Sequence, residues 1–170
     1  MERERKEFLM RKQILDLISK NSRISAEDLA AMLGTTKDVI EYEIKAMEEE
    51  KVICGYPTLI NWDQTDHEKV TALIEVKVTP QRDMGFNKVA ERIYKFEEVE
   101  SVYLMSGGFD LTVIIQGKSM KEVSRFVFEK LSTLEYVNST ATHFVLKKYK
   151  EHGLTMAGER QKEERMLITP

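Results

Sequence analysis

The chain has 170 residues, of which 42% are hydrophobic and 32% charged, so it can form one ordinary domain or two small ones with packed cores. The formal net charge is −3, and residues 1–60 hold 10 Lys and Arg against 12 Asp and Glu, which excludes a strongly basic nucleic-acid-binding module. One cysteine, Cys54, excludes an internal disulfide, and the lack of a long apolar run predicts a cytoplasmic protein that does not enter a membrane.

Three helices are predicted in the first 60 residues. The first has an apolar stripe at helical spacing, formed by Phe8, Leu9, Ile14, Leu15, Leu17 and Ile18. Ser25 with Asp28 three positions later predicts the start of the second helix, and Gly34 predicts its end. Thr35 or Thr36 then caps a third helix, whose apolar stripe is Val39, Ile40, Ile44 and Met47.

The segment after the third helix, "KVICGYPTLINW", has β-branched residues on both sides of a Gly-Tyr-Pro turn and predicts a short hairpin. Three helices with a tight turn between the second and third, followed by a hairpin, indicate a winged helix-turn-helix domain over residues 1–60. A plain three-helix bundle would show the same core pattern. In a helix-turn-helix, the helix after the turn lies in the major groove of DNA.

The predicted contacts to double-stranded DNA surround the turn and follow the third helix: Arg23, Thr35, Thr36, Lys37, Asp38, Glu41, Tyr42 and Lys45. The same helix carries six acidic residues between Asp38 and Glu50, and these repel phosphate. We therefore expect weak nonspecific binding, with the run Glu48–Glu50 pointing away from DNA. Further phosphate contacts are expected from a basic stripe on the first helix, formed by Arg3, Arg5, Lys6, Arg11 and Lys12.

Residues 61–69 are polar and unpatterned and are interpreted as a linker. Residues 70–150 then predict a ferredoxin-like domain of the order βαββαβ. Residues 70–79 alternate as a strand, Phe86 to Phe96 have helical spacing, and "GGFD" joins two further strands. Ser119 caps a second helix, and a last strand follows from Tyr136. The predicted fold class is thus α+β, with the winged helix-turn-helix joined to this ferredoxin-like domain.

One face of the predicted sheet carries both helices. The other face is expected to present Leu104, Val113, Ile115 and Phe144 or their neighbours and to pack against a second copy of the chain. Residues 151–170 form a C-terminal extension, whose closing apolar run "RMLITP" is expected to dock on another subunit.

The two halves together resemble the Lrp/AsnC family of feast/famine transcriptional regulators. The matching segments are "ILDLISKNSRISAEDLAAMLGTT", "VICGYPTLIN" and "YLMSGGFDLTVII", within about residues 8 to 150. The resemblance implies a homodimer formed through the C-terminal sheets, with octamers as a further assembly. It also implies a small-molecule effector, commonly an amino acid, and no other cofactor and no metal.

The resemblance places this effector between subunits at Met105, Ser106, Gly107, Gly108, Phe109 and Asp110. The residue types suit that role, because the two glycines leave N–H groups free for a carboxylate and Asp110 can accept from an ammonium group. An ordinary hairpin turn would have the same composition.

The chain departs from the family at Glu43, where an Arg is usual, and at Lys51, where a Gly is usual. Some siroheme decarboxylases resemble the same architecture without binding DNA. His67, His143 and His152 are far apart in sequence, however, and no nucleophile motif is present, so we expect no enzyme activity. A third alternative is an effector-sensing module in which Glu48–Glu50 contact a protein.

Overall fold

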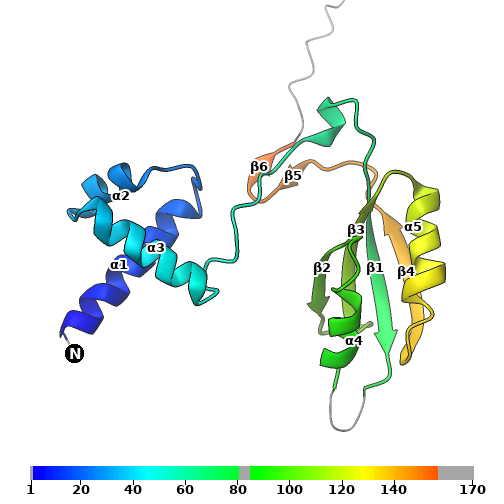
Figure 1. Ribbon diagram of the computed structural model, residues 1–170. Helices are drawn as coiled ribbons and strands as arrows, with labels where there is room; N and C mark the ends of the chain where they lie inside the picture. Colours follow the sequence, from blue (N-terminus) through cyan, green and yellow to red (C-terminus); the bar gives the residue numbers. More distant parts are fainter. Residues whose placement is uncertain (1, 81–84, 157–170) are drawn as a thin grey trace, which may run out of the picture. The chain divides into compact units, whose positions relative to one another are not determined.

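The structure is a computed structural model that describes residues 2–80 and 85–156. The chain divides into two compact units, Met1–Thr58 and Leu59–Pro170, each with its own hydrophobic core (Figure 1). Within the described ranges, none of the helices has the length and apolar character needed to cross a bilayer.

The first unit consists of α1 (Glu2–Ile18), α2 (Ala26–Leu33) and α3 (Lys37–Glu49). Its core contains one or more buried residues from each helix: Ile14, Leu29, Ala30, Ile40 and Met47, with Ile53. The predicted ends of α2 are confirmed, since the Ser25 hydroxyl accepts from the Asp28 N–H at 3.0 Å and Gly34 has a φ of 64°. Thr36 takes the cap position of α3 in extended backbone, but its hydroxyl makes no capping hydrogen bond.

The hairpin predicted after α3 is wrong, because residues 51–61 form no strand. The Val52 N–H instead donates to the Met47 carbonyl at 2.9 Å and the Lys51 N–H to the Glu48 carbonyl at 3.2 Å, which ends the helix in a Schellman turn, and the Ile53 N–H also donates to Met47 at 3.0 Å. Lys51 occupies the left-handed position of that turn with a φ of 60°. Ile53 is then buried in the core. Val52 and Ile53 therefore end the helix and do not form a strand.

The second unit contains a four-stranded antiparallel sheet in the order β2-β3-β1-β4. Its strands are β1 (Val70–Val78), β2 (Val99–Leu104), β3 (Leu111–Gly117) and β4 (Val137–Phe144). Its helices are α4 (Asn87–Ile93) and α5 (Met120–Phe126), and a π-helical turn, η2 (Val127–Leu131), continues α5. Ser119 caps α5 as predicted, accepting from the Glu122 N–H at 3.2 Å. The order βαββαβ confirms the predicted ferredoxin-like fold.

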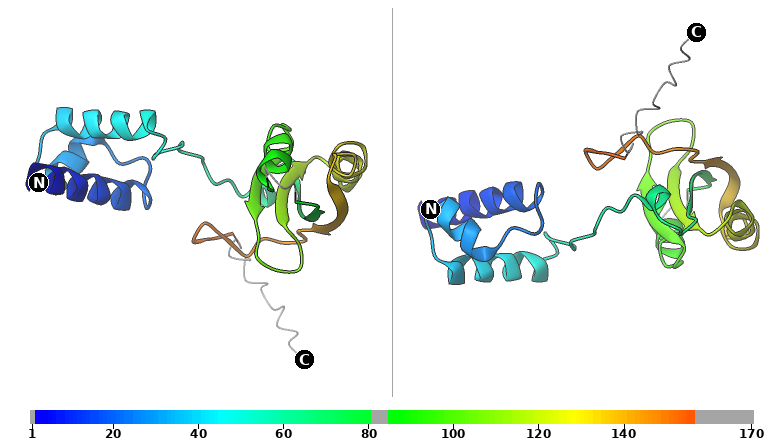
Figure 2. Two further views of the ribbon diagram at one scale, coloured as in Figure 1. Left: turned by 90° about the horizontal axis from the view of Figure 1, so that it is seen from below. Right: turned by 90° about the horizontal axis from the view of Figure 1, so that it is seen from above.

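The core of this unit lies between the sheet and the two helices. Figure 2 gives two further views of the chain. Val113 lies opposite Ile74, and both Ile115 and Phe144 lie opposite Ala72, so all three belong to the face that packs on the helices. Their neighbours Ile114 and His143, rather than Val113, Ile115 and Phe144 themselves, therefore lie on the open face. In an antiparallel sheet an offset of one residue moves a side chain to the opposite face. Leu104 is 62% exposed at the end of β2.

The other sheet face, which we call the open face, is mixed in character. It carries Leu73, Glu75, Tyr103, Thr112, Ile114, Ala141 and His143, as the strand register shows. Leu73 and Ile114 are half-buried, and Tyr103 is 51% exposed. His143 Nε2 lies 3.3 Å from Glu75 Oε1 on this face.

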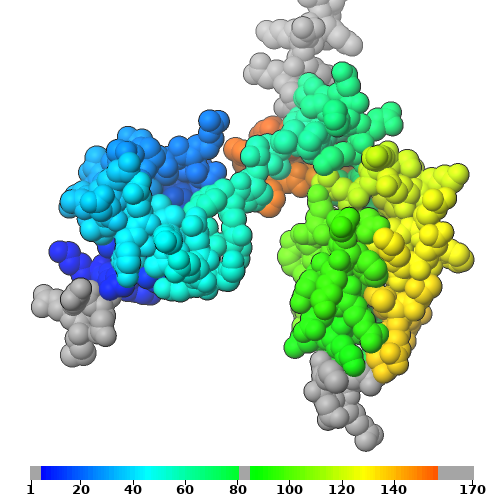
Figure 3. Space-filling model, in the orientation of Figure 1, coloured from blue at the N-terminus to red at the C-terminus, as the bar shows by residue number. Residues whose placement is uncertain are grey.

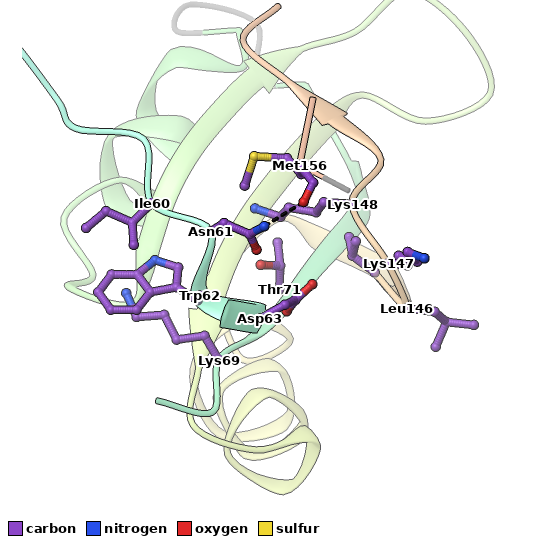
Figure 4. A pocket seen from close by; sticks show the side chains of 11 residues that line it. Ile60, Asn61, Trp62, Asp63, Lys69, Thr71, Leu146, Lys147, Lys148 and Met156 are labelled. Atoms are coloured by element: carbon purple, nitrogen blue, oxygen red, sulfur yellow. Dashed lines mark hydrogen bonds between the residues drawn. The ribbon is translucent and has the colours of Figure 1, made fainter. Parts of the chain in front are cut away.

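The chain after β4 forms an additional hairpin, β5 (Lys150–Glu151) and β6 (Leu154–Thr155), that was not predicted. The Asn61 side-chain amide donates to the Met156 carbonyl at 2.5 Å, beside the short helix η1 (Trp62–Gln64) (Figure 4). Lys69 Nζ lies 4.0 Å from the Trp62 ring centroid. Residues 61–69, interpreted as a linker, are thus packed within the second unit. The run "RMLITP" lies outside the described residues.

Candidate functional site

The exposed face of α3 contains the residues expected to contact DNA. Thr36, Lys37, Asp38, Glu41, Tyr42 and Lys45 are all exposed, and so is Arg23 before α2. Thr35 is half-buried. The structure also places Val39 on this exposed face, where its side chain is 37% exposed. The apolar stripe in the sequence had assigned Val39 to the core. In the space-filling view, α3 lies within the cyan surface of the first unit (Figure 3).

Glu43 lies on the opposite, core-facing side of α3 and is only 5% exposed. Its carboxylate accepts a hydrogen bond of 2.6 Å from Nε of Arg11 on α1. Nη1 of the same guanidinium lies 2.9 and 3.1 Å from the two oxygens of Glu50. These bonds from Glu43 and Glu50 raise the pKa of Arg11 above its ordinary value. Arg11, expected to bind phosphate, is instead shared between two acids, Glu43 in α3 and Glu50 at its C-terminal cap.

Most of the remaining acids of α3 also have partners within the first unit. Lys37 Nζ lies 2.7 Å from Glu27 and 3.4 Å from Glu41, and the hydrogen bond to Glu27 is the main cause that raises the pKa of Lys37. The Tyr56 hydroxyl donates to Glu48 at 2.8 Å, and burial together with this bond raises the pKa of Tyr56 to about 12. These contacts hold most of the acidic side chains in place but leave the helix net negative, because Arg11 and Lys37 are each shared between two acids and the Tyr56 hydroxyl carries no charge.

The turn expected to bind the effector joins β2 to β3 as a hairpin, closed by the Met105 N–H donating to the Asp110 carbonyl at 2.8 Å. Met105, Ser106, Gly107 and Gly108 are exposed, whereas Phe109 and Asp110 are half-buried. A Cβ atom added at either glycine would meet no heavy atom within 4 Å. The packing of this chain alone therefore leaves open space beside both glycines.

Asp110 also has a role within the fold that the sequence did not predict. Its Oδ2 accepts from the Val78 N–H at 2.8 Å, and its own N–H donates to the Val76 carbonyl at 3.0 Å. These bonds attach the turn to the end of β1. The hydrogen bonds of the fold itself therefore hold the Asp110 carboxylate in place.

Two family models match the chain. The Lrp/AsnC ligand-binding domain matches residues 71–155, and the winged helix-turn-helix DNA-binding domain matches residues 10–53. The uncharacterised HTH-type transcriptional regulator YugG of Bacillus subtilis is 51% identical over 160 residues, which are 93% of this chain and 95% of that protein.

Solved structures share the fold at lower identity. The leucine response regulatory protein of Mycobacterium tuberculosis has a TM-score of 0.71 and 18% identity over 87% of this chain and 98% of its own. A transcriptional regulator of Neisseria meningitidis, solved as a complex with L-Met, has a TM-score of 0.65 and 22% identity over 84% of this chain and 91% of its own. The chain belongs to the Lrp/AsnC family of helix-turn-helix transcriptional regulators, which confirms the resemblance, and it joins a DNA-binding unit to a unit that binds a small effector.

Proposed function

We propose that α3 binds double-stranded DNA through its exposed face and that an amino acid bound at the β2–β3 turn changes this binding, in the cytoplasm and without enzymatic chemistry. The observation that carries the DNA-binding half is the division of α3 into two sides. Thr36, Lys37 and Tyr42 point outward, whereas Glu43 is buried against Arg11. Side chains that donate hydrogen bonds to phosphates and bases are thus presented, and the most buried acid is not.

The effector half is supported by the open space beside Gly107 and Gly108 and by the fixed carboxylate of Asp110. Backbone N–H groups near the glycines suit a ligand carboxylate, and the second oxygen of Asp110 suits an ammonium group. Both groups are present in every free amino acid. The structural relative solved with L-Met has the same fold, which is consistent with this class of ligand.

We further propose that two copies pair through the open face of the sheet. Leu73 and Ile114 lie side by side there, with Tyr103 nearby on β2. An antiparallel sheet can leave one face to water, but apolar side chains gathered on that face favour a partner, and a second copy of the same face can cover them symmetrically. Octamers would then be a further assembly of these dimers.

The test is fluorescence anisotropy with DNA from the region upstream of the protein's own gene, at low and at physiological salt, with and without a mixture of amino acids. We expect binding that weakens steeply with salt and changes with the mixture. Absence of binding at low salt would overturn the proposal. A shifted absorption spectrum on incubation with siroheme would, in that case, support the decarboxylase alternative, and a response to amino acids without DNA binding would support the protein-interaction alternative.

A further inference from the structure

The ion pair between Arg11 and Glu43 occupies an unusual place, inside the contact between α1 and α3. Ile40, Glu43 and Met47 follow one another at helical spacing on α3, and the Glu43 side chain is 6% exposed. On α1, Arg11 lies one turn before the fully buried Ile14 and is 24% exposed. Both charged residues therefore belong to the stripes through which the helices pack, where an unpaired carboxylate is strongly unfavourable.

The guanidinium of Arg11 binds α3 at two points. Nε donates to Glu43 at 2.6 Å, while Nη1 donates to Glu50, two turns further along the same helix, at 2.9 Å. A planar fork that satisfies two carboxylates at once tolerates little sliding or rotation of one helix against the other. Apolar contacts between the same stripes are non-directional and would tolerate more. The pair thus sets the rotation of α3 about its own axis.

That rotation decides which side chains α3 presents outward. With Glu43 turned toward α1, the exposed positions are Lys37, Glu41, Tyr42 and Lys45, among others. Arg11 also offsets one of the two negative charges of Glu43 and Glu50, which repel phosphate. We propose that Arg11 is a positioning residue for DNA binding, which acts through Glu43 and Glu50 and does not itself contact DNA. This inference rests on the proposed binding of DNA by α3.

The test compares single and double variants by DNA affinity, measured on the full chain where circular dichroism shows each variant to be fully folded. The probe is a duplex of about 30 bp from upstream of the protein's own gene, at low salt. Arg11→Gln should weaken binding about tenfold, since it leaves Glu43 buried without a cation. Arg11→Gln with Glu43→Gln leaves no buried charge but still lacks the fork, so it should recover the stability of wild type while it still binds DNA several-fold more weakly.

Two further variants separate positioning from bulk charge. Arg11→Lys keeps the charge but not the fork, so it should still weaken binding several-fold. Lys20→Gln removes the same charge in the turn after α1, at an exposed position outside the proposed interface. It should change the DNA affinity less than about twofold. Urea unfolding of each variant measures its stability separately. A variant that is as stable as wild type but binds DNA more weakly therefore reports on positioning and not on a loss of stability.

The proposal is overturned if Arg11→Gln or Arg11→Lys binds with the wild-type affinity, or if Lys20→Gln weakens binding as much as Arg11→Gln. If Arg11→Gln does not fold, Arg11→Lys and the double variant are compared with wild type instead. Wild-type DNA affinity in either of them overturns the proposal. Wild-type protein that does not bind the duplex at low salt refutes the proposed DNA binding and this inference together. Wild-type binding that Arg11→Lys leaves unchanged refutes the inference alone.

Discussion

The backbone N–H of Val78 donates a hydrogen bond of 2.8 Å to the side-chain carboxylate of Asp110. This bond connects the last residue of β1 to the residue that precedes β3, beside the turn proposed to hold the effector. The carboxylate therefore has two separable properties. It accepts a backbone hydrogen bond, and it carries a charge that an ammonium group can use.

Asp110→Asn should separate these properties. The amide oxygen can still accept from Val78, so we expect the free energy of unfolding to change by less than about 1 kcal/mol. The charge is lost, so the response of DNA binding to amino acids should disappear. Asp110→Ala should lose both, with destabilisation of about 1–2 kcal/mol. Calorimetry with the amino-acid mixture and urea unfolding measure the two effects, and unchanged ligand affinity in Asp110→Asn would refute this placement of the effector.

Lys51→Gly should stabilise the first unit. Lys51 has a φ of 60° in the turn that ends α3, a conformation that costs an L-residue roughly 1 kcal/mol and glycine almost nothing. Loss of the favourable cation at a helix C-terminus offsets a few tenths of this gain. Lys45→Gly is the matched control, because it removes the same charge but places glycine at an exposed position inside α3, and it should destabilise by about 1 kcal/mol. Equal urea midpoints for Lys51→Gly and wild type would contradict the prediction.

Lys37→Gln should reduce the salt dependence of DNA binding. If Lys37 leaves Glu27 and Glu41 to bind a phosphate, its removal lowers the slope of log K against log salt by about 1. Glu27→Gln should strengthen binding, since it releases Lys37 from its shorter ion pair. Anisotropy titrations at several salt concentrations measure both slopes. An unchanged slope in Lys37→Gln would remove Lys37 from the interface.

The ion pair between Glu98 and Lys130 predicts a pH dependence of stability in the second unit. The hydrogen bond from Lys130 is the main cause that lowers the pKa of Glu98. The pair therefore stabilises the fold above the ordinary Glu pKa of about 4.3, and this contribution is lost as the pH falls through the lower pKa of the folded state. Urea unfolding of Lys130→Met should lose less stability than wild type between about pH 7 and pH 3. Lys95→Met, at an exposed position, should follow the wild-type curve.

Ile114→Asp should break the proposed dimer. The substitution places a carboxylate at the centre of the open face, where a partner would have to bury it. We expect a monomer by light scattering at a concentration where wild type is a dimer, with an unchanged circular dichroism spectrum. Ser124→Asp adds the same charge at an exposed position of α5 and should remain dimeric. A dimeric Ile114→Asp would place the interface elsewhere.

The helices and strands of this protein could be predicted because their signals are local. Ser25 accepts from an N–H three residues away, and Gly34 acts through its own φ angle, so the ends of α2 depend on neighbours alone. The alternation of Val70–Val78 likewise reflects the two-residue period of a strand. The hairpin prediction failed because Val52 and Ile53 also suit a helix ending, and only the burial of Ile53 distinguishes the two.

The sequence by itself determined the order of elements and the fold class, since these follow from short-range periodicity and capping. Only the tertiary structure decided the partners of the charged groups. Arg11 and Glu43 are 32 residues apart, as are Val78 and Asp110, and no local pattern predicts which residues meet over such distances. Docking of the helices and the register of the strands bring them together, because burial of the apolar cores sets both. For this reason the sequence shows only a run of acids along α3, whereas the fold shows which side chain most of these acids contact.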